Sequence, residues 1–107
     1  MREPIEVFAP PAPGSLMRGV TLIKPGRFRL ARRDAELYSV QVVGSGSWGR
    51  VRIENGAGRE LFEQPSSFTG SFVLSAGADG GIVVELAGQR GAPCLAVNWR
   101  EKDADLV

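Results

Sequence analysis

The sequence predicts an all-β domain: an antiparallel β-sandwich of jelly-roll type, or a small barrel, with seven or eight short strands and an extended N-terminal arm. Apolar and polar residues alternate in several short segments, as in strands with one buried face. Turn residues, mostly glycine, separate these segments about every ten residues. No window has the apolar spacing of an amphipathic helix.

Length and composition fit a single globular domain, since the 107 residues are 43% hydrophobic and 23% charged. We divide the chain into a proline-rich arm (1–19), a β-sandwich domain (20–101) and a charged C-terminal tail (102–107). Prolines in the arm favour an extended course without internal hydrogen bonds. The apolar runs are shorter than the roughly 18 residues of a membrane span, and no secretory leader opens the sequence. We therefore expect no membrane association.

The first four predicted strands cover residues 20–24, 27–30, 36–43 and 50–54. The dipeptide Pro25-Gly26 marks a turn between the first two. The third has the clearest alternation, with Tyr38, Val40 and Val42 on one face. Residues 44–49, GSGSWG, are expected to form a flexible hairpin loop before the fourth strand.

The remaining predicted strands begin after Asn55-Gly56, a strong hairpin signal because both residues accept positive φ. The chain returns over residues 59–63, continues in an aromatic strand around Phe72, and enters a strand at 81–87. Residues 88–93 are expected to connect to a last strand at 94–99. The predicted core comprises Tyr38, Val40, Val42, Val51, Ile53, Leu61, Phe68, Phe72, Leu74, Ile82, Val84, Leu86, Leu95 and Val97, with Trp99 on the same face as the last two.

The residue inventory argues against an enzyme, and no catalytic, cofactor or metal site is predicted. Histidine is absent, which removes the commonest general base and the commonest transition-metal ligand. A single cysteine, Cys94, excludes an internal disulfide and a cysteine-clustered metal site. Carboxylates such as Glu60, Glu63 and Glu85 remain, but no pair of them has a placement that indicates acid–base chemistry.

One motif imitates a phosphate-binding loop. Residues 44–51 match GxGxxGxV, the pattern of dinucleotide-binding and kinase glycine-rich loops. A dinucleotide site requires a helix after the third glycine, because the helix N-terminus holds the pyrophosphate. An alternating strand follows here, and a kinase would need many more residues. We interpret the motif as a loop between strands.

Two features suggest contacts with other molecules. Trp48 lies beside three glycines, and we expect it to make an intersubunit contact, to contact a ligand such as a glycan, or to fold back on its own domain. Arg27 and Arg29 form a basic stripe with Phe28 between them, which suits nucleic acid or the carboxylates of a neighbouring subunit. Residues 1–33 carry seven basic and two acidic groups, residues 34–107 six basic and ten acidic. The chain as a whole is not basic, so nucleic acid is not the expected partner.

Residues 37–101 resemble a family of virion proteins. The stretch runs LYSVQVV, a Gly/Ser loop, a strand ending at Asn55-Gly56, a return strand, SFTGSFVLSAG, GGIVVELAG and CLAVNWRE. Strand order and glycine placement are similar to those of small β-sandwich virion proteins of tailed phages and phage-like particles, which decorate heads or form the base of spikes and fibres. The resemblance covers about 60% of the chain.

The resemblance implies a structural virion component that acts by assembly and attachment, assembled in the host cytoplasm and located in the virion. Its partners would be capsid, spike or fibre subunits and other copies of the chain, with the proline-rich arm gripping a neighbouring subunit. The alternative is a carbohydrate-binding or adhesin-like module that binds a surface glycan through Trp48 and polar loop groups. The candidate interface residues are Ile5, Val7, Phe8, Leu16, Met17, Arg27, Arg29 and Trp48.

Overall fold

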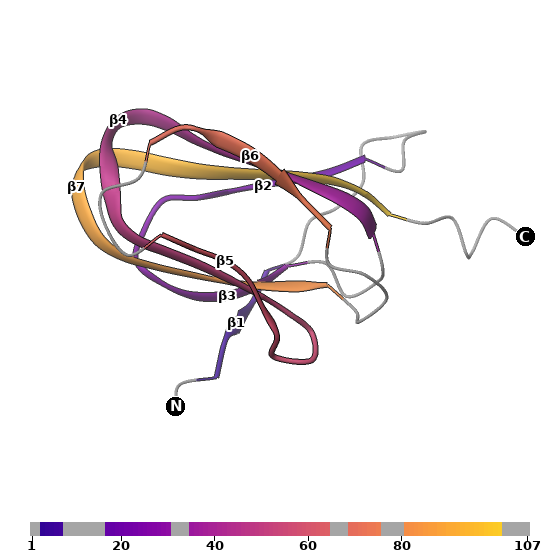
Figure 1. Ribbon diagram of the computed structural model, residues 1–107. Coiled ribbons are helices and arrows are strands. Elements are labelled where there is room, and N and C mark those ends of the chain that lie inside the picture. Colours follow the sequence, from indigo (N-terminus) through magenta and orange to yellow (C-terminus); the bar gives the residue numbers. More distant parts are fainter. Residues whose placement is uncertain (1–2, 8–16, 31–34, 65–68, 76–80, 102–107) are drawn as a thin grey trace, which may run out of the picture.

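The computed structural model describes residues 3–7, 17–30, 35–64, 69–75 and 81–101, and their only regular structure is β-strand (Figure 1). This confirms the all-β prediction. The strands form one curled sheet of half-barrel shape, in the order β1-β3-β7-β4-β5, with β2 also paired to β7 and β6 also paired to β4. No helix in the described part is long and apolar enough to cross a bilayer. The strands are β1 (Ile5–Glu6), β2 (Met17–Leu22), β3 (Gly26–Leu30), β4 (Ala35–Asn55), β5 (Glu60–Gln64), β6 (Ser71–Leu74) and β7 (Ile82–Glu101).

Two long strands, β4 and β7, are the spine of the fold. They pair antiparallel in one register from Tyr38↔Trp99 to Asn55↔Ile82. Both bend sharply together near their middles, so the sheet folds back over itself (Figure 1). The upper layer contains the first half of β4 and the second half of β7, flanked by β6 and β2. The lower layer contains the other halves, flanked by β5 and β3, with β1 on the outer edge of β3.

The bend corrects the prediction of loops at residues 44–49 and 88–93, which instead pair with each other as the middles of β4 and β7. Glycines at positive φ allow the two backbones to turn while staying hydrogen-bonded. Gly46, at φ 112°, lies opposite Gly91, at φ 76°. A Cβ on Gly46 would collide with the carbonyl oxygen of Arg90. We call residues 44–49 and 88–93 the glycine corner.

The glycine corner also changes which residues point inward. In β4, Tyr38 and Val40 are buried before the corner, whereas Val51 and Ile53 are buried after it. The inward set therefore switches from even to odd numbers, because positive-φ residues interrupt the strict alternation of a strand. A period of two read across the corner would place the second half of each strand on the wrong face.

The core lies between the two layers and contains most of the predicted residues. Tyr38, Val40, Val51, Ile53, Ile82, Val84, Leu86, Leu95, Val97 and Trp99 are buried as predicted, and Val42, Leu61, Phe72 and Leu74 pack partly buried against them. Phe68 lies outside the described residues. Four core members were not predicted: Leu22, Phe28, Leu30 and Trp48. Phe62 of β5 stacks on Phe72 of β6 with ring centroids 4.0 Å apart, which joins the lower layer to the upper one.

The hairpin predicted at Asn55-Gly56 is present, but its positive-φ glycine is Gly58. Asn55 N donates to Arg59 O at 2.8 Å, and the Asn55 side-chain oxygen accepts from the backbone N of Ala57 and of Arg59, both at 2.9 Å. The loop therefore has three residues, in which the left-handed position comes last. A bulge follows between Ile53 and Glu54, opposite Leu61.

The predicted boundary between arm and domain at residue 19/20 differs from the structure. Strand β2 begins at Met17 and pairs with β7, because Val20 and Leu22 contribute apolar side chains to the upper layer. Ile5 and Glu6 pair in parallel with Phe28 and Arg29 of the same chain. The two described ends of the arm are thus part of the sheet. Residues 8–16, which include Phe8 and Leu16, and the tail 102–107 lie outside the described residues.

Candidate functional site

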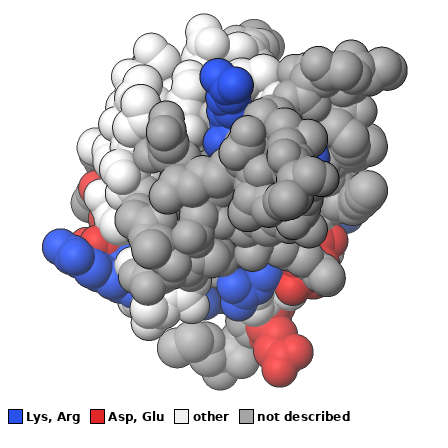
Figure 2. All heavy atoms as spheres, turned by 90° about the vertical axis from the view of Figure 1, so that its right-hand side faces the viewer, with Lys and Arg blue, Asp and Glu red and all other residues white. Residues whose placement is uncertain are grey.

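The two outer faces of the folded sheet differ in chemistry. Cross-strand rows alternate between buried and solvent-facing, so residues of one row share a face. Figure 2 shows most charged atoms of the described residues in the lower half of that view. The charged face of the lower layer comprises Arg27, Arg29, Arg50, Arg52, Glu54, Glu60, Glu63 and Glu85. The neutral face of the upper layer comprises Gly19, Thr21, Ser39, Gln41, Val43, Ser71, Val73, Cys94, Ala96 and Asn98.

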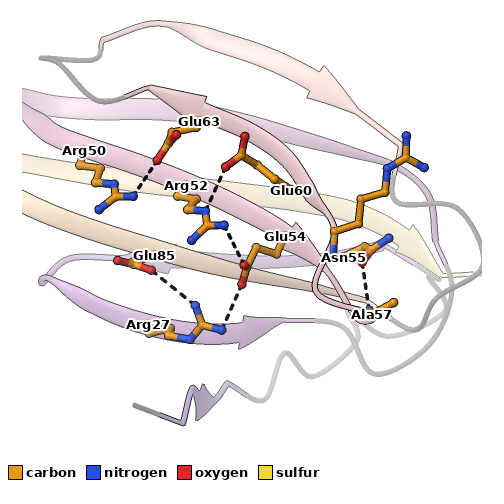
Figure 3. A network of polar contacts seen from close by, with 10 residues as sticks. Arg27, Arg50, Arg52, Glu54, Asn55, Ala57, Glu60, Glu63 and Glu85 are labelled. Carbon is orange, nitrogen blue, oxygen red and sulfur yellow. Dashed lines mark hydrogen bonds and ion pairs between the residues drawn. The ribbon is translucent and has the colours of Figure 1, made fainter. Parts of the chain in front are cut away.

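The charged face is a ladder of ion pairs across four neighbouring strands (Figure 3). The row Arg27, Glu85, Arg52, Glu63 alternates in sign from β3 through β7 and β4 to β5. Glu54 accepts from two guanidinium groups, Arg27 Nη2 at 3.0 Å and Arg52 Nη2 at 3.2 Å, and its side chain is only 11% exposed. Glu54 thus has one partner on its own strand, β4, and one on β3, which lies on the far side of β7.

The remaining contacts of the ladder involve Glu60, Glu63 and Glu85, the carboxylates that the sequence analysis considered for acid–base chemistry. Glu60 Oε1 binds Arg52 Nε at 3.2 Å, and Glu63 Oε2 binds Arg50 Nη2 at 2.7 Å. The hydrogen bond and charge of Glu63 raise the pKa of Arg50 above its ordinary value. Glu85 Oε1 binds Arg27 Nη1 at 3.4 Å. All three carboxylates therefore face a guanidinium, which is an arrangement for stabilising the layer.

A surface hollow of about 420 Å³ lies over this ladder, lined by Arg27, Arg52, Glu54 and Glu85 together with Pro25, Gly26 and Leu86. Its positive and negative groups bind each other. Among the described residues, no group of three or more His, Cys, Asp or Glu side chains is placed to hold a metal ion. The hollow is therefore the solvent-facing side of a neutralised network.

Arg27 and Arg29 find their carboxylates in the same chain, whereas the sequence suggested those of a neighbouring subunit. Arg27 binds Glu54 and Glu85, and Arg29 Nε contacts Glu6 Oε1 at 3.4 Å. The physical reason is register: β7 and β1, on either side of β3, place acidic residues opposite or next to both arginines. Spacing along β3 alone gave no sign of these partners.

Removing the central arginine of the ladder should destabilise the fold. We expect Arg27→Ala to lower the free energy of unfolding by about 1–3 kcal/mol, because a largely buried Glu54 loses one of two partners and Glu85 loses its own. Arg29→Ala breaks a more exposed pair with Glu6 and should cost less than about 1 kcal/mol. Urea unfolding of both variants measures the difference, and equal losses would contradict the burial argument.

The prediction that Trp48 is available for an outside contact is wrong. Trp48 is 0% exposed and belongs to the core, since the glycine corner folds its side chain between the layers. Both a glycan platform and an intersubunit contact need an exposed ring, so the structure shows the third alternative, folding back on its own domain. Trp48 Nε1 has no hydrogen-bond partner among the described residues.

The other candidate interface residues have mixed positions. Ile5 and Met17 are exposed, and Val7 packs partly buried against the core. Sequence reasoning missed Leu37 and Val73, which are 55% and 62% exposed. The signal for Leu37 was present, because it alternates with the inward Tyr38 and so shares its face with Ser39 and Gln41.

The neutral face, bordered by Leu37 and including Val73, is the candidate functional site. Its rows cross all four strands of the upper layer: Gly19–Asn98–Ser39–Val73 is one, and Thr21–Ala96–Gln41–Ser71 is the next. Arg100, opposite Met17, stands at its rim. No family model, curated protein or solved structure matches the chain.

Proposed function

We propose that this chain is a structural subunit of a tailed phage or phage-like particle, of the head-decoration or spike- and fibre-base type, that acts by assembly with other proteins. The observation that carries the proposal is the neutral face. The resemblance of residues 37–101 to small virion β-sandwiches supplies the class of assembly. A glycan-binding function has lost the residue that motivated it, because Trp48 is buried.

The neutral face shares one property with the centres of protein interfaces, which is the absence of charged side chains. None of its ten residues carries a charge, and depletion of charge is typical of the centre of protein interfaces. Its side chains are mostly short, so docking restricts few rotatable bonds. Val73 within it and Leu37 at its border add exposed apolar area. Such a face can be covered by another protein without stripping water from ions.

The charged face supplies the complementary property. The eight ionised side chains of this face, each paired with an opposite charge of the same chain, keep that side of the fold in water. Covering them would require the removal of water from all of them. The two faces thus give the subunit one side for docking and one for solvent, as in a protein bound to the outside of a larger assembly.

The proposal predicts that the chain is present in particles and that a charge on the neutral face removes it. Ala96, at the centre of the face, is the position to change. We expect Ala96→Arg to reduce incorporation at least about tenfold, equivalent to about 1.4 kcal/mol, because an unpaired charge would be buried. Particles are purified by density gradient from cells that express the chain from its native genome. The amount of the chain in the particles is then measured by mass spectrometry.

Ala57→Arg is the matched control, because it adds the same side chain at the exposed tip of the β4–β5 hairpin. Circular dichroism and thermal unfolding verify that both variants are folded. Wild-type chain absent from purified particles, or normal incorporation of folded Ala96→Arg, would refute the proposal.

A further inference from the structure

The outer edge of β3 binds a strand from the N-terminal segment. Ile5 and Glu6 pair in parallel with Phe28 and Arg29, and Val7 N donates to Arg29 O at 3.0 Å. The Glu6 carboxylate reaches Arg29 Nε at 3.4 Å, while Val7 packs against the core. The edge therefore recognises three consecutive residues by backbone hydrogen bonds, one ion pair and one apolar contact, which is the pattern of β-strand addition.

This contact is small enough to open and reform. Strand β1 has two residues, and Ile5 is 56% exposed. The ion pair between Glu6 and Arg29 is partly exposed, and such a pair contributes little to stability because solvent screens it. Elements held by few buried contacts open more readily than the core of a domain. Dissociation of β1 from the edge of β3 therefore requires little free energy.

The chain between β1 and β2 has the length and composition to reach a neighbour. Residues 8–16, FAPPAPGSL, separate a strand on the lower layer from one on the upper layer. Fully extended, nine residues span about 30 Å, which limits how far β1 can lie from β2 of the same chain. Pro10, Pro11 and Pro13 fix φ and so reduce the entropy that an extended segment loses on docking.

We propose that the edge of β3 is the docking site for β1 of a second copy of this chain, so that neighbouring subunits exchange their N-terminal strands. Every contact of the exchanged strand is already present within one chain: the parallel register, the Glu6–Arg29 ion pair and the apolar contact of Val7. Exchange makes the same contacts between chains, and high local concentration favours it.

Two other edge strands, β5 and β6, suit such a partner less. β5 carries Glu60 and Glu63 and a bulge in its pairing with β4, features that discourage strand addition. β6 has only four residues. The edge of β3 is the one on which the structure shows a strand seated. The exchange rests on the assembly function proposed above and uses a surface other than the neutral face.

Disulfide trapping tests the exchange directly. Glu6 and Arg29 are opposite in register, and adjacent strands place such Cα atoms within the range that a disulfide spans. Two single-cysteine variants, Glu6→Cys and Arg29→Cys, each also carrying Cys94→Ala, are mixed at about 1 mM in a glutathione buffer. Intact-mass spectrometry counts the 6–29 heterodimer. Exchange predicts at least about tenfold more heterodimer than a mixture of Glu6→Cys with Arg59→Cys, which places the thiol on an exposed turn.

A double variant, Glu6→Cys with Arg29→Cys in one chain, establishes that the bond can form. If it oxidises within the monomer while the mixed single variants give no more heterodimer than the Arg59→Cys control, exchange is refuted. A chain that joins particles but forms only the internal bond overturns the exchange and leaves the proposed function standing. Heterodimer without incorporation into particles overturns the proposed function alone.

Discussion

Gly46→Ala is expected to lower the free energy of unfolding by about 3 kcal/mol or more, enough to unfold much of a domain of this size. Gly46 sits at φ 112°, a conformation that side chains rarely adopt, and an added Cβ would collide with the carbonyl of Arg90. That carbonyl belongs to β7, which pairs with β4 on both sides of the corner, so it has little room to withdraw. Urea unfolding followed by circular dichroism measures the loss.

Gly58→Ala separates the two causes. Gly58 also has positive φ, 87°, but a Cβ there would meet nothing within 4 Å. This variant tests backbone strain alone and should cost about 1–2 kcal/mol. If the two glycine variants lose the same stability, the close approach of β4 and β7 at the corner does not constrain residue 46.

Trp48→Ala is expected to destabilise the protein by about 3–5 kcal/mol, because it removes one of the two fully buried tryptophans of the described core and leaves a cavity between the layers. Trp48→Phe should cost clearly less, since the ring is largely retained and an indole N–H without a hydrogen-bond partner among the described residues is removed. Chemical denaturation compares both variants with Leu37→Ala, which changes an exposed apolar residue and should shift stability by less than about 0.5 kcal/mol.

The Trp48 series also bears on function. A folded Trp48→Ala variant with unchanged stability would mean that the indole is not packed in the core. It would then be exposed, and binding to a glycan or a neighbouring subunit through that ring would again require testing. If the free energy of unfolding is lowest for Trp48→Ala, intermediate for Trp48→Phe and highest for wild type, the ring stabilises the fold by packing in the core.

The sequence by itself determined the features that depend on local interactions. Alternation identified the strand segments on both sides of the corner, and nine of the fourteen predicted core residues are fully buried, among them Tyr38, Val51 and Leu95. The hairpin after β4 was recognisable because Asn55 bonds to backbone groups only two and four residues away. The prediction placed the positive-φ glycine two residues too early. Gly56 and Gly58 can both adopt positive φ, and only the geometry of the closed loop determines that Gly58 does so.

Only the tertiary structure decided the features that join residues distant in the chain. Residues 44–49 read as a loop because their partners, residues 88–93, are about forty positions away and equally poor in strand formers. The burial of Trp48 follows from that pairing. Arg27 likewise found Glu54 and Glu85 through the order of strands β3, β7 and β4, and Glu6 reached Arg29 through a parallel contact. Backbone pairing across a sheet depends on register between strands, which periodicity within one strand does not encode.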